Sequence, residues 1–304
     1  MLVRTRNAIQ NSAERLWRWS SYRVLSGWDR VRDFFVELEE ETRPAHRRPR
    51  RNRREPSVPS VPERVRKAAV PEDTRVYAIG DIHGRADLLK QLMVKIEADA
   101  EAAPERRKVI VFLGDYVDRG FQSKDVIDFL LSDALGAYET RFLKGNHESA
   151  LEMFLNDPDF GPEWARFGGA ETIMSYGVQP PRARTSPDKW REACERLNTL
   201  MPKAHRHFLS ELELYCELGD YLFVHAGLRP GRPLEQQAER DLLWIRDDFL
   251  NDPGLFDRMI VHGHTPIQAP HRDGRRIGVD TGAYLTGRLT AACLSGTNVS
   301  FIAT

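Results

Sequence analysis

The chain has 304 residues, of which 41% are hydrophobic and 30% are charged, and its 45 Lys and Arg residues balance 45 Asp and Glu residues. This composition is typical of a chain with a sizeable core and excludes a wholly disordered or fibrous protein. The longest apolar runs, such as 109–113, are too short to cross a bilayer, and no apolar segment after Met1 predicts a signal peptide. Three cysteines without paired spacing indicate a reduced, cytoplasmic protein with no thiolate metal site.

The N-terminus is basic, because residues 1–71 carry 17 Lys and Arg residues against 9 Asp and Glu residues. Its first part, 1–42, contains Leu, Val, Trp and Phe at helical spacing, and the pair Asn11 and Glu14 resembles a capping box. We therefore expect an amphipathic helical segment there.

An Arg/Pro-rich linker is expected at 43–73, where seven arginines fall between Arg43 and Arg54. Two interpretations of residues 1–70 stay open. The helix can pack on the rest of the chain or on a second copy, with a solvated linker behind it. Alternatively, tryptophan and arginine together suit contact with an anionic membrane surface or a nucleic acid. The sequence does not fix the oligomeric state.

From residue 74 onward, short β-branched runs each end in a polar loop. Leu, Ile and Val at helical spacing in 86–101 and 122–134 separate the first three runs, and 288–294 and 297–303 alternate as further strands. Strands that alternate with helices predict a parallel sheet, whose ligands bind beyond the carboxyl ends of the strands. We therefore expect the loops to converge on one site. They read GDIHG (80–84), GDYVDRG (114–120), GNHE (145–148), HAG (225–227) and GHT (263–265).

In this order, the five motifs resemble the phosphoprotein phosphatase family of calcineurin-like metallophosphoesterases, and within it the bacterial and phage serine/threonine protein phosphatases. The similarity covers about residues 74–294. It implies the α/β fold class, as a four-layer α/β/β/α metallophosphoesterase sandwich in a catalytic domain at 74–304 with two metal ions at its centre. The segment 149–220 contains no metal-binding pattern, and we expect it to form a cap that sets substrate choice.

The resemblance assigns Asp81 and His83 to the first metal and Asp115 to both metals. It assigns the second metal to three further ligands, Asn146, His225 and His264. Carboxylate, imidazole and carboxamide donors suit two divalent ions of the Mn²⁺, Fe²⁺ or Zn²⁺ type better than Ca²⁺, and we expect Mn²⁺. In such a site, a hydroxide between the metals attacks phosphorus in line without a phosphoenzyme.

Four catalytic residues are expected beside the metals. The resemblance makes His147 the general acid for the leaving oxygen and Asp118 the carboxylate that orients it. Arg119 is placed to bind phosphate oxygens, and Arg246 in LLWIRDD matches the W-x-R element of the phage-like members. The alternative for Arg246 is a surface arginine beside two aspartates.

Two nearby residues are left outside the predicted site. His262 precedes the predicted ligand His264 by two positions, but Pro266 stands where a G-H-x-H motif has its second histidine. We therefore interpret His262 as strand-end structure. Tyr284 lies in no motif that fixes its register, and we assign it no role.

The predicted function is that of a metal-dependent phosphomonoester hydrolase, a serine/threonine protein phosphatase whose substrate is a phosphoprotein or phosphopeptide. The alternative with the same fold is a bis(5′-nucleosyl)-tetraphosphatase (symmetrical) or another small-molecule phosphoesterase, which usually differs at the positions of His83 and Asp118. A third interpretation is a binding or scaffold protein with a degenerate site. The presence of every predicted ligand argues against it.

Overall fold

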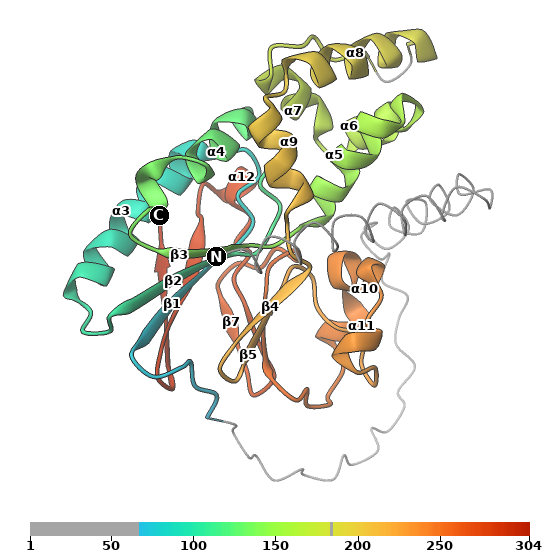
Figure 1. The fold of residues 1–304 in the computed structure, drawn as a ribbon. Helices are drawn as coiled ribbons and strands as arrows, with labels where there is room; N and C mark the ends of the chain where they lie inside the picture. The colour runs from blue at the N-terminus through green and yellow to red at the C-terminus, as the bar shows by residue number, and fades with distance from the viewer. Residues whose placement is uncertain (1–66, 183–184) are drawn as a thin grey trace, which may run out of the picture. The chain divides into compact units, whose positions relative to one another are not determined.

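The computed structural model describes residues 67–304 except 183 and 184, so the predicted N-terminal helix and most of the linker lie outside the described residues. The first of two five-stranded sheets has the order β10-β9-β1-β2-β3 (Figure 1). Its parallel strands are β1 (Thr74–Ile79), β2 (Arg107–Phe112) and β3 (Glu139–Phe142). Two antiparallel strands extend it beside β1, namely β9 (Thr290–Ser295) and then β10 (Asn298–Ala303).

The second sheet has the order β4-β5-β6-β8-β7. Its parallel centre consists of β5 (Tyr221–Val224), β6 (Met259–His262) and β8 (Arg276–Gly278). Strands β4 (Tyr215–Leu218) and β7 (His271–Arg272) close the two edges in antiparallel pairing.

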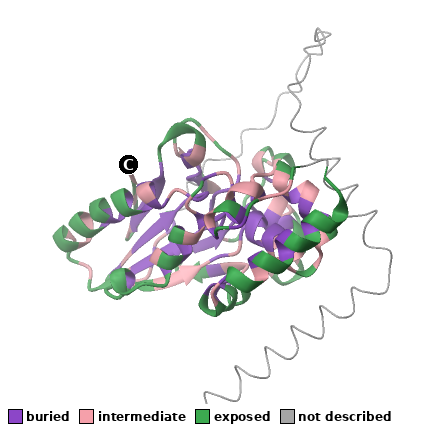
Figure 2. Ribbon diagram, turned by 90° about the horizontal axis from the view of Figure 1, so that it is seen from above, coloured by how far each residue is buried: buried purple, intermediate pink, exposed green. Residues whose placement is uncertain are grey.

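The core lies between the two sheets, where one cluster of buried apolar side chains draws on both. Val76 and Ala78 of β1 and Phe223 of β5 belong to it. Because side chains alternate along a strand, Tyr77 faces the other way, and its hydroxyl donates to Asp99 of α3 (Ala86–Ala102) at 2.7 Å. In Figure 2 the buried residues gather along the strands.

Helices cover the outer faces of both sheets. Helices α3 and α4 (Ser123–Leu130) lie against the first sheet. Helices α10 (Glu239–Trp244) and α11 (Asp247–Leu250) cover the second, where Leu222 and Ile260 share a buried cluster with side chains of both helices. The order helix, sheet, sheet, helix confirms the predicted four-layer α/β/β/α sandwich.

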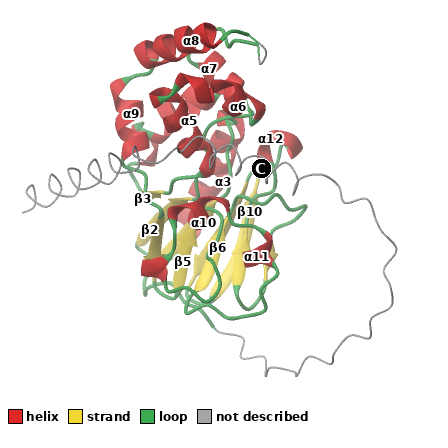
Figure 3. Ribbon diagram, turned by 90° about the vertical axis from the view of Figure 1, so that its right-hand side faces the viewer, coloured by secondary structure: helices red, strands yellow, loops and turns green. Residues whose placement is uncertain are grey.

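A group of helices follows β3 and lies beyond the ends of the strands (Figures 1 and 3). Its members are α5 (Asn146–Asn156), α6 (Gly161–Arg166), α7 (Gly169–Ser175), α8 (Pro187–Leu200) and α9 (Lys203–Ser210). We call α5–α9 the helical segment. The cap predicted at 149–220 therefore runs past the last of these helices into β4, which belongs to the second sheet.

Short elements complete the described chain: η2 (Asp133–Leu135), η3 (Pro158–Phe160), η4 (Leu234–Gln236) and α12 (Ala283–Thr286). Among the helices that the structure describes, none has the length and hydrophobicity that crossing a membrane requires.

The end of the predicted linker lies inside the domain. Ala68 and Val70 are buried in the core between the sheets, and the backbone N–H of Val70 donates to the carbonyl of Gly296 at 3.1 Å. These two residues of the predicted linker therefore contribute to the core, although the pattern of the first strand begins only after them.

Candidate active site

The predicted site residues follow the carboxyl ends of strands, except Arg246 between α10 and α11, and many have an unusual backbone. Of the six non-glycine residues with positive φ in the described chain, five are predicted site residues. They are His83 (46°), Asp115 (53°), Asp118 (72°), Arg119 (67°) and His264 (64°). L-residues rarely adopt this conformation, which costs of order 1–3 kcal/mol each and concentrates at functional sites.

Two motif glycines give the carboxylates room. A Cβ at Gly145 would lie 2.1 Å from Asp115 Oδ1, and a Cβ at Gly263 would lie 2.1 Å from Asp81 Oδ1. Any other residue at either position would displace a predicted ligand. These glycines therefore set how closely the carboxylates approach the backbone.

Two predicted histidine ligands are oriented by backbone carbonyls. His83 Nδ1 lies 3.0 Å from the carbonyl oxygen of Val117, and His225 Nδ1 lies 2.8 Å from that of Leu113. Their Nε2 atoms face Asp115, each 3.5 Å from one of its oxygens. A carbonyl on Nδ1 fixes the tautomer that presents Nε2 to a metal.

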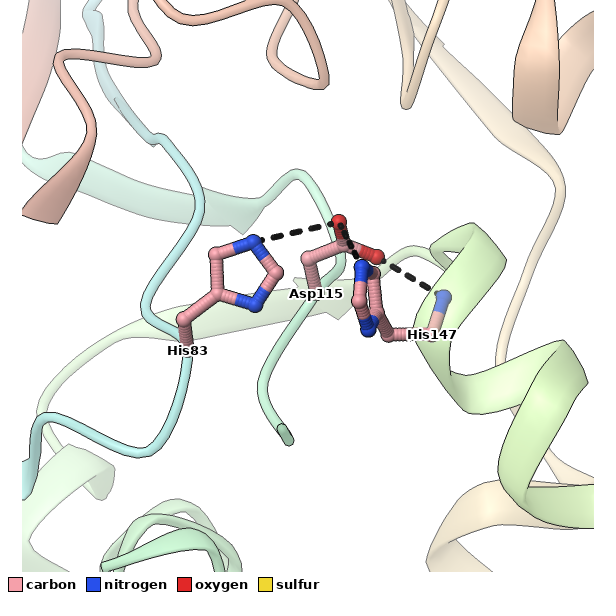
Figure 4. A group of neighbouring side chains, drawn as sticks. All are labelled: His83, Asp115 and His147. Carbon is pink, nitrogen blue, oxygen red and sulfur yellow. Dashed lines mark hydrogen bonds and ion pairs between the residues drawn. The ribbon is translucent and has the colours of Figure 1, made fainter. Parts of the chain in front are cut away.

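The donor atoms form two groups that share Asp115. His83, Asp115 and His147 make the first (Figure 4), and Asp115, His225 and His264 make the second, with ligand atoms within 4.8 Å of one another in each. Asn146 joins the second group, since its Oδ1 lies 2.9 Å from His225 Nε2 and 2.9 Å from His264 Nδ1.

The site fits divalent metals on its own chemistry. His225 Nε2 and His264 Nδ1 both lie 2.9 Å from Asn146 Oδ1, so two ring nitrogens and a carboxamide oxygen meet beside Asp115, as the ligands of a divalent metal do. Burial raises the pKa of Asp81 and Asp115 well above the usual range, and further carboxylates nearby raise both pKa values too. Bound cations would relieve this repulsion.

Asp81 lies in the site, close enough to Asp115 for the charge of that carboxylate to raise its pKa. Both of its oxygens lie 3.1 Å from the backbone nitrogen of His264, which holds the carboxylate beside the loop of that residue. Its assignment to the first metal stays a prediction.

Asp280 is a site carboxylate that the sequence analysis does not include. It is buried, and burial raises its pKa to about 6. Its Oδ1 accepts the backbone N–H of Gly282 at 2.8 Å, and it lies close enough to Asp81 to raise that residue's pKa. Its position just after β8, in the sequence Val-Asp-Thr-Gly, is the signal that could have revealed it.

Glu148 holds the loop that carries Asp115. Its Oε2 accepts the N–H groups of Asp115 and Gly145, each at 2.9 Å, and its Oε1 accepts those of Tyr116 at 2.8 Å and Val117 at 3.2 Å. The side chain is fully buried, and burial raises its pKa to about 7. The GNHE motif contains this residue, but motif matching alone gives it no role.

We expect Glu148→Gln to destabilise the fold by about 1–3 kcal/mol, because an NH₂ group replaces an oxygen that accepts two N–H groups. The measurement is the free energy of unfolding in urea. Glu152→Gln is the control, since Glu152 lies on the same helix but pairs with a side chain, Lys144. If the free energy of unfolding fell by the same small amount in both variants, the role given to Glu148 would be contradicted.

His147 and Asp118 form a buried pair. His147 Nδ1 lies 2.7 Å from Asp118 Oδ2, which leaves Nε2 facing Asp115 Oδ2 at 3.9 Å and Arg119 Nη2 at 3.4 Å. Burial lowers the pKa of His147, as does the charge of Arg119, and burial raises the pKa of Asp118 to about 7. The geometry suits transfer of a proton at Nε2, beside the candidate metal centre.

The two predicted arginines flank the carboxylates. The guanidinium of Arg119 lies 4.5 Å from the centre of the Tyr284 ring, a cation–π contact that supports it from one side. Arg246 is half-buried, and its Nε is buried without a hydrogen-bond partner in the described chain. Burial and the charge of Arg119 lower the pKa of Arg246. Two guanidiniums close enough to repel each other suit an anion between them.

His262 lies at the end of β6 and outside both groups of ligand atoms. Its Nε2 is 3.1 Å from Arg276 Nη1, and its Nδ1 is 3.0 Å from the carbonyl oxygen of Gly263. Both ring nitrogens therefore have partners within the fold, which agrees with the interpretation of His262 as a structural residue.

A four-layer sandwich with carboxylate and imidazole groups at the ends of its strands defines a metal-dependent phosphoesterase. The family described as calcineurin-like phosphoesterase matches residues 74–294, and the chain belongs to this family. Its members use two metal ions, for which the structure provides the two candidate ligand groups.

Curated relatives point to one branch of the family. The chain is 28% identical over 235 residues to the bis(5′-nucleosyl)-tetraphosphatase PrpE [asymmetrical] of Anoxybacillus flavithermus, with 70% of this chain and 87% of the relative covered. It is 26% identical over 252 residues to the protein of the same name from Bacillus subtilis, at the same coverage.

A solved structure supports the fold. The crystal structure of a protein assigned as a diadenosine tetraphosphatase matches with a TM-score of 0.51 and 22% identity. The match covers 78% of this chain and 98% of the other.

Proposed function

We propose that the protein hydrolyses bis(5′-nucleosyl) tetraphosphates asymmetrically, into a nucleoside monophosphate and a nucleoside triphosphate. The observation that carries the proposal is the similarity to proteins of that name over 87% of their length. The relatives therefore favour the class of activity that the sequence analysis gives as its alternative, with asymmetrical in place of symmetrical cleavage.

The arrangement of charges supports an extended polyphosphate. Both arginines lie close to the carboxylates of Asp81 and Asp115. The charge of Arg119 opposes the rise in the pKa of both carboxyl groups, and their charges in turn oppose the fall in the pKa of Arg246. When bound, two divalent ions would neutralise phosphate charge and supply an activated water. Arg119 and Arg246 would hold the phosphate oxygens beside Asp115 while water attacks phosphorus and the P–O–P bond breaks, with the nucleoside triphosphate as the leaving group.

In this reaction, His147 stands where the leaving oxygen departs. Its Nε2 faces the candidate metal centre, and Asp118 holds the imidazole through Nδ1. A proton at Nε2 would pass to the departing phosphate oxygen, while the pair with Asp118 keeps the ring in the productive orientation.

The buried His147–Asp118 pair also supports a second candidate, hydrolysis of phosphoserine or phosphothreonine in proteins. A serine alkoxide is a poor leaving group that requires a proton, whereas a nucleoside triphosphate leaves more readily. A firmly held general acid therefore accelerates the hydrolysis of a phosphomonoester more than that of a polyphosphate.

A direct comparison of substrates tests the proposal. The full chain with Mn²⁺ is given diadenosine tetraphosphate or a phosphoserine peptide, with Asp115→Asn as the control for contaminating phosphatases. We expect AMP and ATP as the products and a kcat/KM at least about tenfold higher than for the peptide. ADP as the only nucleotide product would show symmetrical cleavage. Faster release of phosphate from the peptide would favour the protein phosphatase.

A further inference from the structure

Two helices of the helical segment, α6 and α7, form hydrogen bonds with Asp118 in the site. Trp164 of α6 donates its indole N–H to Asp118 Oδ2 at 2.8 Å, and Thr172 of α7 donates its hydroxyl to Asp118 Oδ1 at 2.6 Å. The carboxylate is 0% exposed, and Oδ2 also meets His147 Nδ1. Each oxygen of Asp118 therefore accepts a hydrogen bond from α6 or α7, two helices that contain none of the five motifs.

Thr172 fixes the backbone of Asp118 as well as its side chain. The backbone N–H of Asp118 donates to Thr172 Oγ1 at 2.9 Å while the Thr172 hydroxyl donates back to Oδ1, which closes a ring of hydrogen bonds. Ser123 Oγ lies 3.0 Å from the same hydroxyl. Asp118 has a φ of 72°, a strained value that persists only when the surroundings hold it.

A pair of glycines lets the helical segment approach so closely. Gly168 has a φ of 101° and accepts the backbone N–H of Arg119 at 3.1 Å, and a Cβ there would lie 2.6 Å from that nitrogen. A Cβ at Gly169 would lie 2.2 Å from the indole of Trp164. Larger residues would push α6 and α7 away from the Asp118 loop.

We propose that Trp164 and Thr172 are positioning residues, which orient Asp118 so that His147 presents Nε2 to the leaving oxygen. This inference rests on the proposed function only in taking His147 as the general acid. With one donor on each oxygen, the carboxylate cannot rotate away from Nδ1. The helical segment thus contributes to the rate of bond cleavage as well as to the shape of the site.

The test compares two aryl esters, phenyl phosphate and p-nitrophenyl phosphate, because only the phenolate leaving group depends strongly on a proton. We expect Thr172→Val to lower kcat on phenyl phosphate by roughly 10–100-fold with little change in KM, and to affect p-nitrophenyl phosphate clearly less. Thr172→Ser restores the hydroxyl and should recover most of the rate. Trp164→Phe, which removes the other donor, should show the pattern of Thr172→Val.

Ser175→Ala is the matched control. Ser175 lies on the same helix. Its Oγ accepts the backbone N–H of Lys124 at 3.2 Å and donates to the backbone carbonyl of Thr172 at 2.7 Å, so it contacts neither the Thr172 hydroxyl nor Asp118. This variant should change neither ester's kcat. Equal losses on both esters in Thr172→Val, or a failure of Thr172→Ser to recover the rate, would overturn the positioning role.

An NMR measurement that does not depend on catalysis distinguishes a lost hydrogen bond to Asp118 from general misfolding of a variant. In the metal-free protein, the NMR signal of the His147 Nδ1 proton should exchange faster with water in Thr172→Val and Trp164→Phe than in wild type, and remain protected in Ser175→Ala. An unchanged signal in both variants would contradict the proposal. Wild-type protein that cleaves the aryl esters but not diadenosine tetraphosphate would refute the proposed substrate, while the ester comparison still decides the role of Thr172.

Discussion

Asp115→Asn should nearly abolish turnover and reduce the bound divalent metal from about two ions per chain to well below one. The reason is geometric, since Asp115 belongs to both groups of ligand atoms and lies 3.5 Å from His83 Nε2 and from His225 Nε2. A neutral amide would replace the only carboxylate that both groups share. Metal content by elemental analysis and turnover on p-nitrophenyl phosphate are the measurements.

His83→Ala is the comparison for this prediction. His83 belongs to one group only, so its loss should weaken one metal and leave the other bound. If Asp115→Asn retained two tightly bound ions and full activity, the bridging assignment would be wrong.

The second large effect concerns His147. His147→Asn should retain both metals and lose roughly 10²–10⁴-fold in turnover on a phosphoserine peptide, with a clearly smaller loss on p-nitrophenyl phosphate. The pairing of Nδ1 with Asp118 at 2.7 Å leaves Nε2 as the proton donor. Asp118→Asn should show the same pattern more weakly, because it removes the partner and leaves the imidazole.

Metal content decides between two roles for His147, because His147 also lies in the group formed with His83 and Asp115. Loss of one metal in His147→Asn would make it a ligand, and the general acid would then have to be another residue. Equal losses of turnover on both substrates would mean that His147 orients phosphate or water instead of donating a proton.

The sequence predicts a parallel sheet and the convergence of its loops because both depend on local patterns, whereas the four-layer sandwich is predicted only from the resemblance of the five motifs to a known family. Each strand such as β1 or β2 is a short β-branched run, and parallel strands necessarily bring Asp81 and Asp115 to one edge of the sheet. The burial of Ala68 and Val70 escapes prediction, because two small apolar residues after an Arg/Pro-rich stretch carry no periodic signal.

The site residues that the sequence analysis does not include contact the predicted ones from distant positions in the chain. Thr172 meets Asp118 across 54 positions and Trp164 meets it across 46, so no motif spacing connects them. Asp280 follows a strand of only three residues, β8, so the sequence Val-Asp-Thr-Gly is a weaker signal than the longer strands give the five motifs. Tyr284 meets Arg119 only because α12 folds back beside the Asp118 loop.

The most direct test of a two-metal site centred on Asp115 is anomalous diffraction from crystals of the full chain grown with Mn²⁺. We expect two manganese peaks per chain, about 3.5–4 Å apart, with one oxygen of Asp115 between them and Asn146, His225 and His264 around one peak. A single peak in the site, or two ions that do not share Asp115, would contradict this centre.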